Sequence, residues 1–126
     1  MMQKRMDGIS LNTTDTENVS RIQQFVLLDN PQFFYIEKSQ YTVRNSIIFS
    51  PVYNMSESDI DNAISTISGY VSACMACIDE GASDYDKAVH FYEYVIEHAE
   101  YEENSPHNQD MYSAVLGRTV CQGYAM

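Results

Sequence analysis

The sequence has no tryptophan, few basic residues and no long apolar run. Its 126 residues include seven Lys and Arg against 18 Asp and Glu, for a formal net charge of −11. This charge argues against nucleic acid or an anionic membrane as partner, because both are negatively charged. No stretch approaches the roughly 18 apolar residues of a membrane span, and residues 1–20 lack the apolar core of a signal peptide. We therefore expect no membrane span in this chain, and its localisation stays open.

Cysteine is also scarce, since the chain has only three. An odd number argues against a disulfide framework. Cys74 and Cys77 form a Cys-x-x-Cys pair inside a helical pattern, which is typical either of half a metal or redox site or of two core residues. Because no second ligand pair lies nearby, we interpret both as core residues. The sequence therefore predicts no metal site and no cofactor.

Apolar residues, by contrast, make up 44% of the chain, and ten Tyr and five Phe are among its residues. A chain of this length and composition is expected to fold as one domain or as part of one. The pattern predicts an α+β fold that is mainly helical, in three regions. These are a flexible tail at 1–16, a helix with short antiparallel strands at 17–55, and a helical part at 56–126.

In the middle region, apolar spacing predicts a helix over 17–28 with Thr16 as its N-cap. Aromatic and β-branched runs predict strands at 33–36, 41–44 and 47–52, with Asn45-Ser46 as a hairpin turn. Further on, the pattern predicts a helix from Ser56 to Gly81 and a second one capped by residues 83–86, packed as an antiparallel helical hairpin. A polar loop at 100–108 and a short helix at 110–116, ended by Gly117, follow.

The stretch after Gly117 is the candidate functional site, because it places Cys121 where a new helix begins. A thiol in the first turn of a helix lies near the positive end of the helix dipole and near unpaired backbone N–H groups. These conditions activate a cysteine as a nucleophile. A small buried core residue is the alternative interpretation of Cys121.

The segments Ser83-Asp84-Tyr85-Asp86-Lys87, Tyr112-Ser113-Ala114-Val115-Leu116-Gly117 and Val120-Cys121-Gln122-Gly123-Tyr124-Ala125 resemble the first half of a bacterial transglutaminase-like domain, a relative of the papain-like cysteine proteases. The resemblance covers about the last third of the chain. It implies a Cys-His-Asp triad in which Cys121 is the nucleophile and the His and Asp lie downstream of Met126. It also implies a peptide or protein substrate, attacked at a peptide or glutamine-type amide.

The other candidate residues have simpler interpretations. His90 and His98 lie eight apart, which is not the spacing of two ligands on one side of a helix, so we expect partly exposed residues. His107 lies in the polar loop 14 residues before Cys121 and is the candidate for a substitute base, but the resemblance places the base downstream of Met126 instead. Four acidic residues near the end of the second hairpin helix are interpreted as a solvated helix end rather than a cation site; they are Glu97, Glu100, Glu102 and Glu103.

From the resemblance we expect an N-terminal portion of a cysteine enzyme, inactive at this length because the His and Asp are missing. We also expect it to self-associate, because apolar surface around Val115, Leu116, Val120 and Tyr124 would be left exposed. The alternative is a non-catalytic binding or assembly module with a vestigial cysteine.

Overall fold

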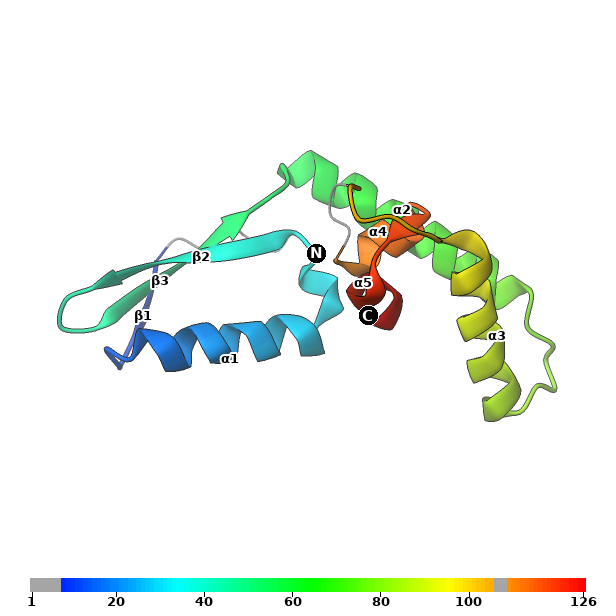
Figure 1. The fold of residues 1–126 in the computed structure, drawn as a ribbon, viewed down its shortest axis with the longest axis horizontal. Coiled ribbons are helices and arrows are strands. Elements are labelled where there is room, and N and C mark those ends of the chain that lie inside the picture. Colours follow the sequence, from blue (N-terminus) through cyan, green and yellow to red (C-terminus); the bar gives the residue numbers. More distant parts are fainter. Residues whose placement is uncertain (1–7, 106–108) are drawn as a thin grey trace. The chain divides into compact units, whose positions relative to one another are not determined.

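The computed structural model describes residues 8–105 and 109–126 and confirms a mainly helical α+β fold (Figure 1). The chain divides into two compact units, Met1–Ser56 and Glu57–Met126. The elements of the first unit are β1 (Ile9–Leu11), α1 (Thr16–Asp29), the 3₁₀ helix η1 (Pro31–Phe33), β2 (Ile36–Val43) and β3 (Ile47–Tyr53). Those of the second are α2 (Glu57–Ala76), α3 (Asp84–His98), β4 (Glu100–Tyr101), α4 (Met111–Val115), β5 (Arg118–Thr119) and α5 (Cys121–Ala125).

The first unit is built on a three-stranded antiparallel sheet in the order β1-β3-β2. β2 and β3 form the predicted hairpin, but its last pair is Val43 with Ile47, so three residues make the turn instead of the expected two. Ile47 is fully buried, and its N–H donates to Thr13 O at 2.8 Å. The hairpin is therefore anchored at its turn end by the segment that follows β1.

Two strand boundaries predicted from the sequence are wrong. Of the strand predicted at 33–36 only Ile36 is a strand residue: Phe33 belongs to η1, and Phe34 and Tyr35 form the turn after it. The reason is that Pro31 begins a helical turn in which the N–H groups of Phe33 and Phe34 bond back to Asn30 and Pro31. Conversely, residues 37–40, predicted as a linker, continue β2 and pair with β3. Polar residues are tolerated there because β2 is an outer strand, and its backbone pairing does not require apolar side chains.

The expected tail contains a strand. Ile9–Leu11 form β1, and Ile9 pairs with Phe49 and Leu11 with Ile47. Three residues carry too little pattern to be recognised, and their partners lie far along the sequence. The part of the expected tail at residues 1–7 lies outside the described residues.

The helix over 17–28 is present as α1, with its cap one residue earlier than predicted. Asp15, not Thr16, is the N-cap, and its carboxylate accepts a hydrogen bond from Asn18 N at 3.0 Å. These contacts with Asn18 hold the pKa of Asp15 below its usual value. Asp is at least as favourable as Thr at the N-cap, so Asp15 takes this position.

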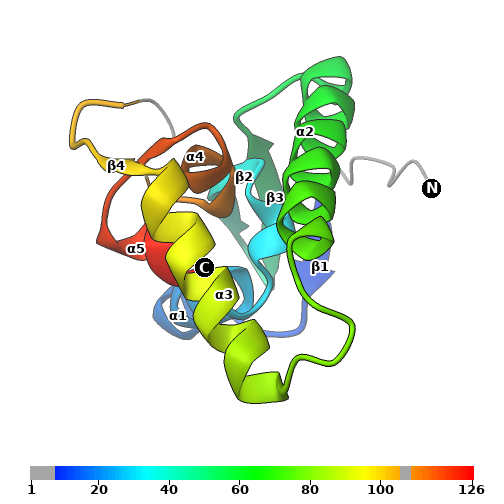
Figure 2. The same cartoon turned by 90° about the vertical axis from the view of Figure 1, so that its right-hand side faces the viewer.

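In the second unit, α2 ends at Ala76, five residues before the end predicted at Gly81. Residues 83–86 cap α3 as predicted, and they do so through a capping box. Ser83 Oγ accepts from Asp86 N at 3.2 Å, and Asp86 Oδ2 accepts from Ser83 N at 3.3 Å. The two helices follow each other along the chain, but the predicted antiparallel packing is wrong: Figures 1 and 2 show them inclined to each other instead of lying side by side along their length. Their side chains meet at Tyr70 and Tyr94, whose rings are 5.1 Å apart and edge to face.

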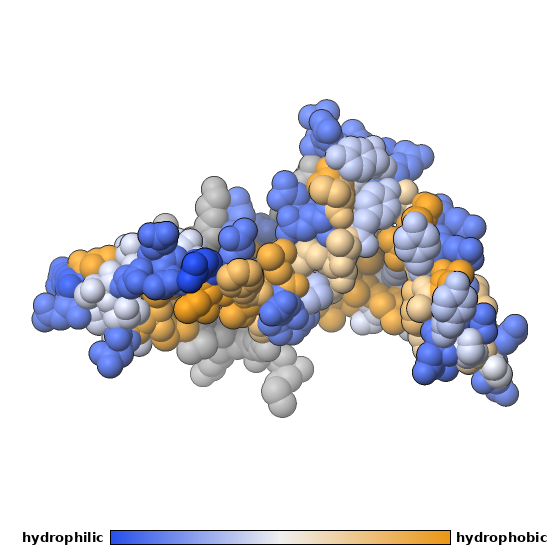
Figure 3. Space-filling model, turned by 60° about the horizontal axis from the view of Figure 1, so that its bottom comes forward, coloured by the Kyte–Doolittle hydropathy of each residue, from blue (hydrophilic) through white to orange (hydrophobic). Residues whose placement is uncertain are grey.

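The short helix α4 lies against both α2 and α3. Asp110 caps it by accepting from Ser113 N at 2.9 Å, and Leu116 is its C-cap. The helix therefore begins and ends where the sequence predicts. On the face drawn in Figure 3, orange apolar residues interrupt the hydrophilic surface of each unit.

Candidate functional site

Cys121 is the first residue of α5, and its side chain is exposed. Val120, in extended conformation, is the N-cap and accepts a backbone bond from Tyr124 N at 3.3 Å. In such a first turn, the N–H groups that precede this bond have no partner within the helix. The structure thus places Cys121 at the helix start that the sequence predicts.

A buried polar pair underlies this turn. Ser113 of α4 and Thr119 of β5 are fully buried, and their hydroxyl oxygens lie 2.6 Å apart. Ser113 Oγ also lies 2.6 Å from Asp110 O, to which it donates, and Thr119 Oγ1 lies 3.4 Å from Val120 O. The pair joins α4 to the residues just before Cys121. The sequence did not predict this hydroxyl pair, because the only sign of it is the small size of the residues around Cys121.

Gly123 packs directly on this pair. A Cβ added at Gly123 would overlap Thr119 Oγ1, and it would lie 2.9 Å from both Asp110 O and Ser113 Oγ. Only glycine leaves room for α5 to approach α4 this closely. The Cys-x-Gly spacing therefore has a structural cause in this fold, whatever the cysteine does.

The turn from α4 into β5 is made by Gly117, whose φ is +84°. A residue with a Cβ is strained in this left-handed region, and a Cβ here would also lie 3.1 Å from His98 O. Gly117 O accepts from Glu100 N at 2.9 Å, which begins a parallel pairing of β4 with β5. The segment 100–101, predicted as part of a loop, is thus a strand that holds the chain leading to Cys121.

Further contacts tie this segment to the end of α3. Glu102 N donates to Thr119 O at 2.9 Å, and the Glu102 carboxylate lies 3.3 Å from the Arg118 guanidinium. Tyr124 Oη donates to Ala99 O at 2.8 Å. Both ends of the Cys121 turn are therefore bonded to the chain that follows α3.

The described histidines are bonded elsewhere than at the cysteine. His90 Nε2 lies 3.1 Å from Cys74 O, and His98 Nδ1 lies 2.8 Å from Tyr94 O. The His98 ring also stacks on Tyr94, with the centroids 4.0 Å apart. His107, the possible substitute base, lies outside the described residues.

Cys74 and Cys77 differ in their surroundings. Cys74 is buried as predicted, and burial, with a smaller effect of Cys77, raises the pKa of its thiol. Cys77 is exposed and follows the end of α2, so its assignment to the core is wrong. Over residues 8–105 and 109–126, no three His, Cys, Asp or Glu side chains gather where they could hold a metal ion.

The surface expected to drive self-association is partly covered. Val120 is buried, Val115 and Tyr124 are half-buried, and the Tyr124 hydroxyl donates to Ala99 O. Leu116, at the end of α4, is 54% exposed. The apolar surface near Cys121 is thus smaller than the sequence suggests.

No model of a known protein family matches the chain, and no curated protein is significantly similar to it. Within the part of the chain that the structure describes, no helix has the length and apolar character needed to cross a membrane.

Proposed function

We propose that Cys121 is the nucleophile of a transglutaminase-like or cysteine-protease-like enzyme that acts on peptide or glutamine-type amides. The observation that carries this proposal is the exposure of Cys121 as the first residue of α5, on a turn held by buried hydrogen bonds. A fixed and accessible thiol next to unpaired backbone N–H groups meets two requirements of acyl transfer.

In the proposed reaction, Cys121 Sγ attacks the amide carbonyl carbon, and its proton passes through a histidine base to the departing amine. The backbone N–H of Cys121 stabilises the negative charge on the carbonyl oxygen. A thioester forms as the C–N bond breaks, and water or an amine then takes the acyl group and releases the thiol. The resemblance assigns the histidine and its Asp partner to strands that follow the cysteine helix.

Competitive alkylation tests the assignment of the nucleophile. We expect a peptidyl chloromethyl ketone with glutamine next to the reactive group to label Cys121 about tenfold faster than Cys77 at neutral pH. Peptide mapping by mass spectrometry measures both sites in one sample. Cys121→Ser removes the fast reaction, whereas Cys77→Ser, which removes the other exposed thiol, leaves it unchanged. Preferential labelling of Cys77 in the folded protein contradicts the proposal.

The histidine contacts favour a second candidate, a non-catalytic binding or assembly module with a vestigial cysteine. Neither His90 nor His98 is bonded to Cys121; each contacts a backbone carbonyl. An assay of amide hydrolysis and amine incorporation by the product of the full reading frame separates the candidates. Turnover that Cys121→Ser abolishes supports the enzyme, and its absence supports the module.

We also propose that the chain self-associates through the surface around Leu116. This residue is 54% exposed, so a second copy that covers it would remove apolar surface from water. The association requires no catalytic chemistry and is compatible with either candidate.

A further inference from the structure

The outer side of α3 is apolar and uncovered among the described residues. This helix has 15 residues, none of which is buried. Tyr85, Tyr92 and Ile96 are 76%, 69% and 48% exposed. Spacings of seven and four residues place all three on one side of the helix. A 15-residue helix with such a side normally buries it against another element.

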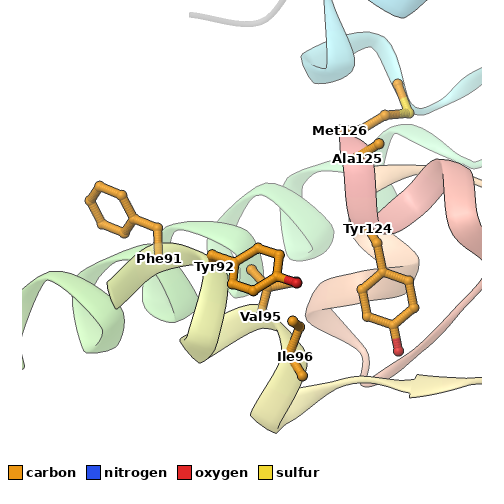
Figure 4. A pocket seen from close by; sticks show the side chains of 7 residues that line it. All are labelled: Phe91, Tyr92, Val95, Ile96, Tyr124, Ala125 and Met126. Atoms are coloured by element: carbon orange, nitrogen blue, oxygen red, sulfur yellow. The ribbon is translucent and has the colours of Figure 1, made fainter. Parts of the chain in front are cut away.

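A hollow lies next to this side of α3, between α3 and α5. It has a volume of about 540 Å³, and its walls include Tyr92, Val95 and Ile96 of α3 with Tyr124 and Ala125 of α5. Figure 4 shows Tyr92, Val95 and Ile96 turned toward Tyr124, whereas Phe91 points away. The hollow is thus an apolar recess between two helices of one unit, a type of site that receives side chains of a docked helix.

The charged residues of α3 indicate which kind of partner can bind its apolar side. α3 carries one lysine, Lys87, whose Nζ lies 3.5 Å from Asp84. Its other acidic residues are Asp86, Glu93 and Glu97. With a net charge of −11, a second copy docked here would bring like charges together, whereas a cationic partner would be attracted.

We propose that the outer side of α3 and the hollow beside it bind a cationic amphipathic helix. An apolar side chain of the partner enters the hollow between Tyr92 and Tyr124, and its Lys or Arg residues face Glu93 and Glu97. Binding weakens as salt rises, because these charge contacts are exposed and screened.

A synthetic peptide of about 18 residues, long enough to form a helix on binding, tests the proposal. It contains only Leu and Lys, with Leu at helical spacing, and carries a fluorescein label. Fluorescence anisotropy measures its affinity for the full chain. Two control peptides are used: one has the same composition without helical spacing, and the other has Glu in place of Lys. We expect both to bind at least about tenfold more weakly.

Variants of the chain locate the site. Tyr92→Ser is expected to weaken binding about tenfold, as the loss of a central aromatic anchor often does. Phe25→Ser, at a residue 59% exposed on α1, is the matched control and should leave binding unchanged. Glu93→Gln with Glu97→Gln should weaken binding and flatten its dependence on salt. Circular dichroism establishes that each variant is folded.

If Tyr92→Ser does not fold, Ala88→Arg replaces it. Ala88 is exposed one helical turn before Tyr92, and an added positive charge there should weaken binding of the Leu/Lys peptide. The proposal is overturned if the Leu/Glu peptide binds as well, or if Phe25→Ser is as harmful as Tyr92→Ser. It is also overturned if light scattering shows that Tyr92→Ser dissolves a dimer that salt strengthens, because a second copy then occupies the surface.

Discussion

At the scale of single residues, Gly123 leaves the room in which the helix that begins at Cys121 packs against α4. We expect Gly123→Ala to destabilise the chain by about 2 kcal/mol, because the added methyl group overlaps Thr119 Oγ1 and crowds Asp110 O. Gly69→Ala is the control: Gly69 lies inside α2, and an added Cβ would meet no atom within 4 Å beyond its own helical turn, so this change should stabilise by about 0.5–1 kcal/mol. Urea unfolding measures both free energies. If both substitutions change the free energy of unfolding in the same direction, close packing is not the reason for glycine at position 123.

Two tyrosines test the value of buried hydroxyl contacts in the same unit. Tyr70 Oη is buried without a hydrogen-bond partner among the described residues, so Tyr70→Phe should stabilise by about 1 kcal/mol. Tyr124 Oη donates to Ala99 O, so Tyr124→Phe should cost about 1 kcal/mol. Thermal unfolding at neutral pH measures the change in stability of each variant relative to the parent chain.

The Tyr70 variant also carries a pH signature. Burial, and then the neighbouring Tyr94, raises the pKa of Tyr70 above its usual value of 10.0. A group whose pKa is raised by folding contributes stability at pH values below its unfolded-state pKa. This contribution is lost as the pH rises through the folded-state pKa. The advantage of Tyr70→Phe over the parent chain should therefore widen above about pH 10. A constant difference across this range would show that Tyr70 ionises equally well in the folded and unfolded states.

The sequence was sufficient to place Cys121 but not to explain what holds it. Gly117 and the residues before it marked a helix end, and the structure confirms that a new helix begins at Cys121. The Ser113–Thr119 contact was not predictable, because it forms only when α4 and β5 fold back on each other. Local patterns report conformation, whereas such contacts depend on the tertiary fold.

At the scale of elements, the capping box of α3 carries a clear prediction. Ser83→Ala removes the acceptor of Asp86 N and should cost about 1 kcal/mol. Ser72→Ala is the matched control, since Ser72 Oγ bonds to Ser68 O inside α2 and alanine favours a helix interior. Its effect should be close to zero or slightly stabilising. Hydrogen exchange should show faster exchange at the start of α3 in the first variant only, and equal effects in both helices would contradict the cap's role.

The helices were more predictable than the strands for a physical reason. A helix repeats its pattern over many residues and is bounded by caps, as Ser83 and Asp110 illustrate. A strand depends on its partner: β1 and β4 are too short to show a period, and the polar residues of β2 are strand residues only because β3 lies beside them. A short stretch of sequence does not reveal pairing with a strand that lies far along the chain.

At the scale of the whole molecule, charge opposes association and apolar surface favours it. Each copy carries a net charge of −11, so two copies repel each other at low salt. Leu116 is exposed beside the cysteine turn, and its burial by a second copy would offset part of that repulsion. The salt dependence of association therefore has the opposite sign to that of cationic peptide binding at α3.

We expect the weight-average mass of the chain to rise with protein concentration, and more steeply at about 500 mM than at about 20 mM NaCl, where the Debye length is several-fold longer. Leu116→Ser should shift the chain toward the monomer. Val43→Ser, at a residue 48% exposed at the end of β2, is the matched control and should leave the mass unchanged. Light scattering across a concentration series measures all three chains. A mass that stays monomeric at both salt concentrations rules out self-association. Association that weakens with salt would show that attraction between unlike charges, not burial of Leu116, holds the copies together.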